Sequence, residues 1–545
     1  MSTRSPADVL LTASAMREAD RITIDEFGLP GFTLMETAGR GATEAVLDAF
    51  GPPTAMRMIV FCGKGNNGGD GLVVARHLVE QGAQVHVVLT SPKAKLREDP
   101  SHNLTLLETL HEESETIRQR LAISQLPDGA ETVAVLDSLA AKIRPTLYVD
   151  ALLGTGLTSD VREPIRSVVT WLNQQEAPTV ALDVPTGLHS DTGAVLGVCV
   201  EATHTITMAA MKAGLVVGGG AAHTGSIRVV DIGMPRHVLD HVATEPGCAL
   251  RTNDADLRAW WPQRSDDAHK YSVGMTLVIG GAPGYTGAPV MASQAAARAG
   301  SGYVACACPA SIQPALAQQM TAVPTVPLPE DEPENESDGG LASGLPQVLQ
   351  DQLNKARAAL VGPGLGRSPS TQTSVRELLA KIDLPLVVDA DGLNAIAGVL
   401  GADNSPFSPD GQWILTPHAG ELQRLVGQPI DLTDRIAVAR CYAEMWDVVL
   451  LLKGHPSVVA DPDGRVFVGG AGGPSLATAG TGDVLAGLCA GFLAQGLEPI
   501  HAVAAAMHLG GRAAEHFAQD ADPRTLQAPD LLDHLPPAAR AITHG

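Results

Sequence analysis

Strand-like runs alternate with helical stretches in two successive series along this sequence, and several of the runs end directly in Gly-rich or acidic loops. Parallel strands joined by helices are buried on both faces and read as short apolar runs. Ligands of such sheets bind at the carboxyl ends of the strands. The pattern therefore predicts an α/β fold with sites at those ends. The predicted strands are residues 58–62, 85–89, 147–150, 180–183, 205–208 and 227–231, then 276–279, 303–307, 359–361, 386–389, 414–416 and 448–452.

A chain of 545 residues exceeds what one hydrophobic core usually organises, so we expect two tandem domains. Between the two series, from about Met234 to Asp256, the sequence has Pro235, Pro246 and Gly247 and no sustained apolar periodicity. We therefore place the domains at residues 1–235 and 257–545, with 236–256 as a linker. Aromatic residues make up only 3% of the chain, so packing must depend on Ala, Val and Leu.

The formal net charge of −23 argues against binding to nucleic acid or to an anionic membrane, because both partners require basic patches. Phosphate can still be held locally by backbone NH groups at helix N-termini. Residues 1–14 lack a basic region followed by an apolar run, and no stretch of 18 apolar residues occurs. We expect a soluble, cytoplasmic protein.

Seven cysteines without CxxC spacing suggest reduced thiols rather than a disulfide framework. Cys306 and Cys308 would face the same side of a strand, and we interpret them as core residues rather than metal ligands. The acidic stretch 327–340 is expected to be a solvated, mobile insertion.

The glycine-rich run GKGNNGGDG at residues 63–71 stands between a predicted strand and the helical stretch 72–80. Five glycines in nine residues predict a loop rather than a helix. Such a loop lets the backbone approach a ligand, and the following helix offers free NH groups to phosphate. The run matches neither GxGxxG nor a Walker loop, so it predicts an anion site but not generic NAD binding.

Three more polar segments follow strands of the first series: Asp150, the segment GTGLT at 154–158, and the segment DVPTG at 183–187. Any one alone would be interpreted as an Asx turn or a helix cap. Because the carboxyl ends of parallel strands meet at one edge of a sheet, the three segments and the glycine run together predict one site.

These segments resemble the epimerase domain of the NAD(P)H-hydrate repair family. The resemblance rests on LMETAG at 34–39, the glycine run, VDALLGTGL at 149–157 and LDVPTG at 182–187. It implies a Rossmann-like three-layer sandwich that interconverts the R and S epimers of hydrated NADH and NADPH. One departure is Thr37, where the family usually has Asn.

The resemblance also implies roles for individual residues. Asn67, Asp150 and Thr186 would coordinate a potassium ion, and Asp183 would lie nearest the hydrated nicotinamide ring as the catalytic carboxylate. Epimerisation requires a carbon–oxygen bond to break and re-form, and a carboxylate can shuttle the proton or stabilise iminium charge. The implied substrate-binding residues are Asn66, Asn67, Gly68, Gly69, Asp70, Gly154, Thr155, Gly156, Leu157, Thr158, Ser159, Asp160 and Asp183.

In the second half, the run ATAGTGDVLAG at 477–487 leads into an Ala- and Leu-rich helical stretch. Small residues before Asp483 would point backbone NH groups into one pocket and place the acid in the first turn of the helix. A simple helix cap is the alternative interpretation. This run resembles the ribokinase-like fold, also a three-layer sandwich, in which the Asp deprotonates the hydroxyl that receives a phosphoryl group.

Further motifs narrow this resemblance to the ADP- or ATP-dependent NAD(P)H-hydrate dehydratase. They are VIGG at 278–281, YTGA at 285–288, GPGLG at 362–366, VDADGLN at 388–394, LTPHAGE at 415–421 and LKGH at 452–455. The implied substrate-binding residues are Ala288, Gly364, His418, Ala419, Gly420, Glu421 and the catalytic Asp483. The implied nucleotide-binding residues are Lys453, Gly454, His455, Pro456, Ser457, Thr478, Ala479, Gly480, Thr481 and Gly482.

The resemblance implies ADP as the phosphoryl donor, with ATP as the alternative, and Mg²⁺ bound with the nucleotide. A metal held by His418 and Glu421 is not expected, because no third ligand with zinc-like spacing is present. The segment GGPSL at 472–476 is a second departure from the family's pattern. It bears on the affinity for the nucleotide and not on the type of reaction. A homo-oligomer would be usual for this family.

Two other functions remain open from the sequence. The second half could be a small-molecule kinase, because the same fold and acid support both reactions. The first half could be a non-catalytic nucleotide-binding or scaffolding module, although Asn67, Asp150, Asp183 and Thr186 argue against a dead site.

Overall fold

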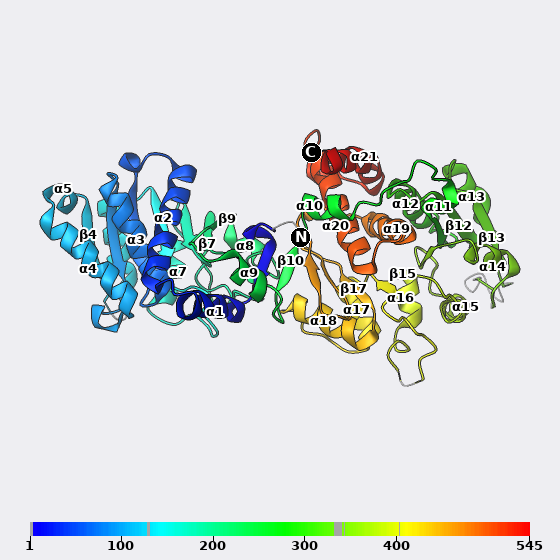
Figure 1. Ribbon diagram of the computed structural model, residues 1–545, viewed down its shortest axis with the longest axis horizontal. Coiled ribbons are helices and arrows are strands. Elements are labelled where there is room, and N and C mark those ends of the chain that lie inside the picture. The colour runs from blue at the N-terminus through cyan, green and yellow to red at the C-terminus, as the bar shows by residue number, and fades with distance from the viewer. Residues whose placement is uncertain (1–3, 128–130, 332–340, 343, 403, 545) are drawn as a thin grey trace. The chain divides into compact units, whose positions relative to one another are not determined.

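The computed structural model describes residues 4–127, 131–331, 341–342, 344–402 and 404–544. The chain forms two compact units, Met1–Ala249 and Leu250–Gly545, and each contains a largely parallel sheet flanked by helices (Figure 1). The predicted α/β class is therefore confirmed. Among the helices of the described residues, none is both long enough and apolar enough to cross a membrane.

The sheet of the first unit is parallel throughout, with the strand order β4-β3-β2-β5-β6-β7-β9. All six strands predicted in this half are present, while β4 was not predicted because its sequence LAISQ has no clear apolar run. The strands are β2 (Arg57–Cys62), β3 (Gln84–Leu89), β4 (Leu121–Gln125), β5 (Leu147–Ala151), β6 (Thr179–Leu182), β7 (His204–Met208) and β9 (Ser226–Val230), with the short pair β1 (Val9–Leu11) and β8 (Met211–Lys212).

Helices cover both faces of this sheet. Ile59 and Phe61 of β2 lie in a core that includes Trp171 of α7 (Ile165–Leu172). On the opposite face, a Cβ atom on Gly71 of α3 (Asn66–Glu80) would lie 3.1 Å from Sγ of Cys62. The unit is thus a three-layer sandwich. Its other helices are α1 (Ala13–Arg21), α2 (Gly31–Phe50), α4 (Glu98–Glu113), α5 (Glu115–Arg118), α6 (Thr132–Ile143), α8 (Ala221–Thr224) and α9 (Arg236–Val242).

The prediction that residues 63–71 form a loop is wrong for most of the run, because α3 already begins at Asn66. The glycines serve close packing rather than an unusual backbone conformation. A Cβ atom on Gly68 would lie 2.0 Å from the carbonyl oxygen of Gly63, and one on Gly69 would lie 2.5 Å from Sδ of Met35. The helix N-terminus can therefore approach the strand ends more closely than side chains would allow.

The second unit has a longer sheet with the order β13-β12-β11-β14-β15-β16-β17-β18-β19. The strands from β13 to β17 are parallel, β18 and β19 continue the sheet antiparallel, and β10 pairs with β19. The strands are β10 (Ala249–Arg251), β11 (Met275–Ile279), β12 (Tyr303–Pro309), β13 (Thr325–Leu328), β14 (Ala358–Val361), β15 (Leu386–Val388), β16 (Trp413–Leu415), β17 (Val449–Leu452), β18 (Val458–Ala460) and β19 (Val466–Val468).

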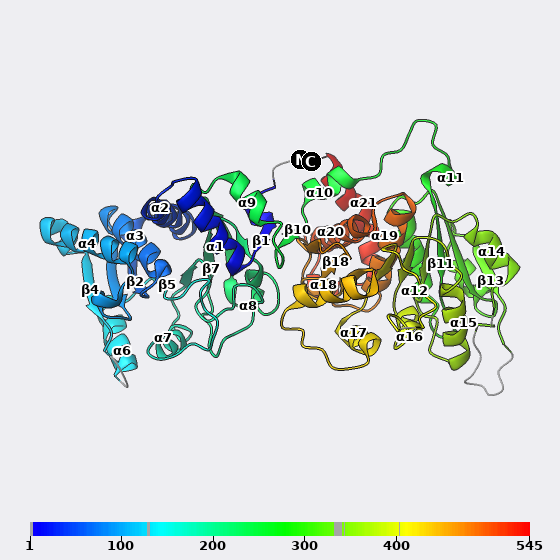
Figure 2. The same ribbon diagram turned by 60° about the horizontal axis from the view of Figure 1, so that its bottom comes forward.

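Alanine-rich helices form much of the core of this unit, as the composition predicted. They are α12 (Gly287–Arg298), α19 (Thr481–Ala494) and α20 (Pro499–Phe517). Cys306 and Cys308 lie in the same core and are fully buried, which confirms their interpretation as core residues. Figure 1 and Figure 2 show the remaining helices around the sheet: α10 (Asp254–Trp260), α11 (Lys270–Val273), α13 (Gln313–Gln319), α14 (Gln347–Leu353), α15 (Pro369–Leu379), α16 (Asp391–Ile396), α17 (Ala419–Val426), α18 (Arg435–Trp446) and α21 (Ala528–His544).

Two segments expected to be irregular contain regular structure. Residues 236–256, expected to be a linker, include α9, β10 and the start of α10. The stretch 327–340 begins within β13, and Glu330 forms an isolated antiparallel bridge with Leu341. Residues 332–340, most of the stretch expected to be mobile, lie outside the described residues.

Candidate functional site

Asp150 is the most deeply buried carboxyl group among the predicted site residues of the first unit. It lies at the end of β5 and is fully buried. Its Oδ2 accepts a hydrogen bond from the Thr186 backbone NH at 2.8 Å, and its Oδ1 accepts one from the Thr186 hydroxyl at 2.7 Å. Burial raises the pKa of Asp150 to about 6, and these hydrogen bonds oppose that shift. A buried carboxyl of this kind would be stabilised in its charged form by a nearby cation.

Asn67 lies in the first turn of α3 and shares a partner with Thr186. Its Nδ2 donates to the Leu153 carbonyl oxygen at 3.1 Å, and the Thr186 hydroxyl lies 3.3 Å from the same oxygen. Oδ1 of Asn67 is buried and accepts no hydrogen bond from the described residues. Asn67, Asp150 and Thr186 are therefore brought together around Leu153, and an unused buried oxygen fits a cation with oxygen ligands.

Asp183 directly follows β6 and has a left-handed backbone conformation with φ of 63°. Its Oδ1 lies 2.6 Å from Nζ of Lys212 and accepts a hydrogen bond from the Thr207 hydroxyl at 3.4 Å. A Cβ atom on Gly154 would lie 3.1 Å from Oδ2 of Asp183. The second carboxylate oxygen therefore faces the glycine at the start of the 154–160 segment, where any side chain would crowd it.

Asp183 and Lys212 both interact electrostatically with two further acids, Asp70 and Asp20. Asp70 on α3 is buried, and burial raises its pKa well above the ordinary value, with Asp183 raising it further and Lys212 lowering it. Burial likewise raises the pKa of Asp20 on α1 to about 6, opposed by Lys212. Three acids and one lysine thus gather at this end of the sheet.

The other predicted substrate-binding residues of this unit differ in exposure. Gly68 and Gly69 are buried, whereas Asn66 is exposed. In the segment after β5 the polar residues are open to solvent: Gly156, Thr158, Ser159 and Asp160 are exposed, and Gly154, Thr155 and Leu157 are partly so. An accessible segment beside a buried acid cluster is suited to a ligand with a polar, extended part. Thr37, which stands where the family usually has Asn, forms a local hydrogen bond: its hydroxyl donates to the Thr33 carbonyl oxygen at 2.9 Å.

In the second unit, Asp483 lies in the first turn of α19, as predicted. The turn before it is shaped by Gly480, which has φ of 90°, and by Thr481, whose hydroxyl is 2.8 Å from both the Leu476 and Thr478 carbonyl oxygens. Burial and Asp389 raise the pKa of Asp483 and Lys453 lowers it, and the net result is a value of about 7. A carboxyl group with a pKa near the working pH is suited to general base catalysis.

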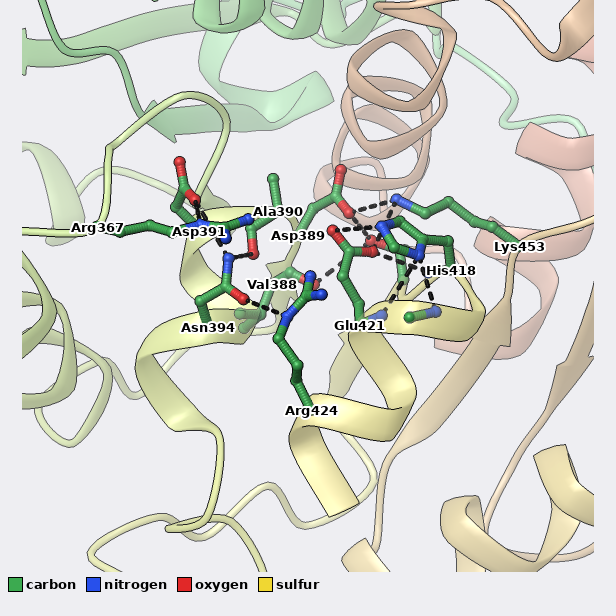
Figure 3. A network of polar contacts seen from close by, with 12 residues as sticks. Arg367, Val388, Asp389, Ala390, Asp391, Asn394, His418, Glu421, Arg424 and Lys453 are labelled. Atoms are coloured by element: carbon green, nitrogen blue, oxygen red, sulfur yellow. Dashed lines mark hydrogen bonds and ion pairs between the residues drawn. The ribbon is translucent and has the colours of Figure 1, made fainter. Parts of the chain in front are cut away.

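Lys453 connects the acids of this site, as Figure 3 shows. Its Nζ lies 2.8 Å from Oδ1 of Asp389 and 3.7 Å from Oε2 of Glu421. Asp389 is buried and also accepts a hydrogen bond from the Thr416 hydroxyl at 2.7 Å. A Cβ atom on Gly482 would lie 3.6 Å from Nζ of Lys453. The two predicted nucleotide-binding segments therefore meet at this lysine.

His418 and Glu421 form a capping box at the start of α17. Nδ1 of His418 accepts from the backbone NH groups of Gly420 and Glu421 at 3.0 and 3.3 Å, and Oε2 of Glu421 accepts from the His418 NH at 2.8 Å. This local pairing explains their spacing of three residues. No group of three or more His, Cys, Asp or Glu side chains suited to a metal ion occurs among the described residues.

A second polar network lies beside the first (Figure 3). Asp391 accepts from the Gly366 backbone NH at 2.9 Å and from Asn394 Nδ2 at 3.2 Å. Oδ1 of Asn394 accepts from Nε of Arg424 at 3.0 Å. Gly364, two residues before Gly366, has φ of 66°, and a Cβ atom on it would lie 3.3 Å from Cβ of Ala288. The motifs at 285–288, 362–366, 388–394 and 415–421 therefore meet at one edge of the sheet.

Several residues of these sites were given no role by the sequence. Lys212 and Asp20 are the clearest cases in the first unit, and Asp389 and Arg435 in the second. Arg435 donates to the carbonyl oxygens of Leu452 and Lys453, both at 3.1 Å. A lone lysine inside the apolar stretch 205–215 was a signal for Lys212. Asp389 lies at the end of a predicted strand and within the motif at 388–394, whereas Asp20 and Arg435 have no comparable signal.

Two family models match the chain. One, described as NAD(P)H-hydrate dehydratase, covers residues 276–537, and one described as YjeF-related protein N-terminus covers residues 31–214. The bifunctional NAD(P)H-hydrate repair enzyme of Salinibacter ruber is 57% identical over 530 residues, covering 97% of this chain and 96% of that protein. This chain belongs to the family of bifunctional NAD(P)H-hydrate repair enzymes.

Other members of this repair enzyme family are more distant. The enzyme of Moorella thermoacetica is 39% identical over 539 residues, covering 98% of this chain and 97% of that protein. Among solved structures, the ADP/ATP-dependent NAD(P)H-hydrate dehydratase of Bacillus subtilis, co-crystallised with ATP and Mg²⁺, is 28% identical with a TM-score of 0.44, covering 53% of this chain and 97% of that one. Since bifunctional relatives match almost the full length, the alternative of a kinase fused to a non-catalytic module is not favoured.

Proposed function

We propose that this chain repairs hydrated NADH and NADPH, with the first unit interconverting the R and S epimers and the second dehydrating the S form at the expense of ADP. The observation that carries the proposal is the presence of two separate acid sites, one around Asp183 and one around Asp483, each at the carboxyl ends of its own sheet. Full-length similarity to bifunctional repair enzymes supports both assignments.

In the epimerase site, Asp183 is proposed to face the hydrated ring through Oδ2. The ring nitrogen expels the C6 oxygen as water once that oxygen is protonated, which leaves an iminium ion. A carboxylate beside the ring stabilises this charge, and water then adds to the other face while losing a proton. The 154–160 segment and the N-terminus of α3 are proposed to hold the phosphates and ribose.

Potassium is proposed to bind through Asn67, Asp150 and Thr186. The support is the unused buried Oδ1 of Asn67 beside a fully buried carboxyl group. A bound cation would supply positive charge that offsets the burial of Asp150. The chain's own residues then keep the Leu153 carbonyl and the following 154–160 segment in place for the substrate.

In the dehydratase site, Asp483 is proposed to take the proton from the C6 hydroxyl, which then attacks the terminal phosphorus of ADP and releases AMP. The ring nitrogen expels phosphate, and loss of a C5 proton restores the dihydropyridine. Lys453 is proposed to approach the transferred phosphoryl group, because it is the cation held beside Asp389 and Gly482. Mg²⁺ is proposed to arrive with the nucleotide and to neutralise phosphate charge.

ADP is the proposed donor and ATP the alternative. The test incubates the protein with mixed hydrates and follows the absorbance of restored NADH with ADP, with ATP and with neither. The proposal requires turnover with a nucleotide and none without. Cytoplasmic localisation and a homo-oligomeric state are part of the same proposal and are tested by fractionation and by light scattering.

A further inference from the structure

The ammonium group of Lys212 is almost wholly buried at the proposed epimerase site. The side chain is 1% exposed, and its partners come from three positions: Asp183 Oδ1 at 2.6 Å, the Thr207 hydroxyl at 2.9 Å and the Met208 carbonyl oxygen at 2.7 Å. A lysine ammonium has three N–H donors. All three are therefore engaged within the protein, so Lys212 has no donor left for a substrate.

The same contacts distinguish the two oxygens of Asp183. Lys212 and Thr207 both contact Oδ1, whereas Oδ2 faces Gly154 and accepts no hydrogen bond from the described residues. The ion pair therefore fixes the rotation of the carboxylate and leaves one oxygen directed at the segment proposed to bind substrate. Because the backbone of Asp183 is itself left-handed, the side chain begins from a constrained position.

We propose that Lys212 is a positioning residue of the epimerase, which holds Asp183 by Oδ1 so that Oδ2 is presented to the hydrated ring. This inference rests on the proposed epimerase function and adds a role that the sequence motifs do not assign. Lys212 acts through Asp183 and does not contact the substrate.

The surrounding charges make the lysine necessary for this role. Asp20 on α1 and Asp70 on α3 both interact electrostatically with Lys212 and Asp183, and burial raises the pKa of both acids. Without Lys212, these three carboxyl groups would lose the cation that interacts with all of them. Like charges at close range repel one another, and Asp183 would lose the lysine that contacts its Oδ1.

The experiment measures epimerisation of the pure R hydrate without nucleotide, so that the dehydratase site is silent. The Lys212→Met variant removes the charge and keeps an unbranched side chain that is one heavy atom shorter. We expect kcat at neutral pH to fall by about 100-fold or more while KM changes little, since positioned proton transfer contributes about that much. The acid limb of the pH–rate profile should move upward by more than about one unit. Lys142→Met, which removes an exposed lysine of α6, should behave as the wild type.

If Lys212→Met does not fold, a second variant tests the positioning role. Thr207→Val keeps the shape of a fully buried side chain and removes the hydroxyl between Lys212 and Asp183. We expect it to lower kcat by about threefold to tenfold and to move the acid limb in the same direction. An unchanged profile in Thr207→Val, or a folded Lys212→Met with unaltered kcat or an unmoved acid limb, would overturn the inference. Absence of epimerisation in the wild type would instead reject the proposed function.

Discussion

Nζ of Lys453 lies 2.8 Å from Oδ1 of Asp389, and the two groups act in opposite directions on Asp483. Asp389 raises the pKa of Asp483 and Lys453 lowers it, and together with burial the result is a value of about 7. Burial lowers the pKa of Lys453 itself, but Asp389 and Glu421 outweigh that effect and raise it. The pair therefore keeps a charged lysine beside a carboxyl group that can change its protonation state near neutral pH.

Replacing Asp483 with asparagine should abolish dehydration while leaving ADP bound. The substitution removes the base but keeps the backbone of the turn formed by Gly480 and Thr481. The rate should fall by about 100-fold to 10,000-fold, the usual contribution of a general base. Restored NADH is measured by absorbance and ADP binding by calorimetry. Near-normal turnover would exclude Asp483 as the base.

The dehydration rate at low substrate should rise with pH through about 7, because Asp483 acts as a base only when ionised. The protonation of Asp483 should also affect the stability of the fold. The folded-state pKa of Asp483 exceeds its ordinary value of 3.8, so the stability it contributes is present at low pH and is lost as the pH rises through about 7. Asp483→Asn should therefore raise the melting temperature relative to the wild type more at about pH 8 than at about pH 5. Equal differences at both values would contradict the assignment.

Potassium should support epimerisation through the oxygen ligands around Asn67. Exchange of potassium for tetramethylammonium should lower the rate, since a bulky organic cation cannot enter among buried oxygens. The Asn67→Leu variant, which lacks the unused Oδ1, should lose the increase in melting temperature that potassium gives the wild type. An epimerisation rate that is the same in both salts would remove the cation from the account.

The chain should divide into two separately active fragments when cut between residues 245 and 248. Helix α9 contacts α1, so it should remain with the first unit, and β10 pairs with β19, so it should remain with the second. Each fragment then keeps its own sheet and its own acid. The C-terminal fragment should consume only the S hydrate from a mixed sample, and addition of the N-terminal fragment should bring conversion to completion. An insoluble or inactive C-terminal fragment would show that the two cores are not independent.

Much of the sheet architecture could be predicted because parallel strands are buried on both faces and read as apolar runs. The twelve predicted strands are all present, with ends that differ by one or two residues. The strands that were not predicted, such as β4 and β18, are short or lie toward an edge, where the apolar signal is weak. The loop prediction for the glycine-rich run at 63–71 was wrong for another reason. Propensity argues against helix at Gly68 and Gly69, but close packing against Gly63 and Met35 outweighs it.

In the proposed sites, likewise, some residues could be predicted from motifs and others could not. Motifs located Asp183 and Asp483 because each follows a strand or opens a helix at a distinctive turn. The ion-pair partners of Lys212 and Asp389 could not be predicted, because an ion pair between distant segments leaves no spacing in the sequence. His418 and Glu421 show the opposite case, since their spacing resembles a ligand pair and the structure explains it as a capping box.

The measurement that tests the central claim most directly follows the pure R hydrate with ADP in the full-length Asp183→Asn variant and in the wild type. The wild type should convert the R hydrate to NADH, because the first unit supplies the S form to the second. The variant should convert the pure S hydrate at the wild-type rate but should convert the R hydrate at least about 100-fold more slowly. If the variant processed the R hydrate as fast as the wild type, or lost activity on the S hydrate equally, the assignment of one reaction to each unit would be contradicted.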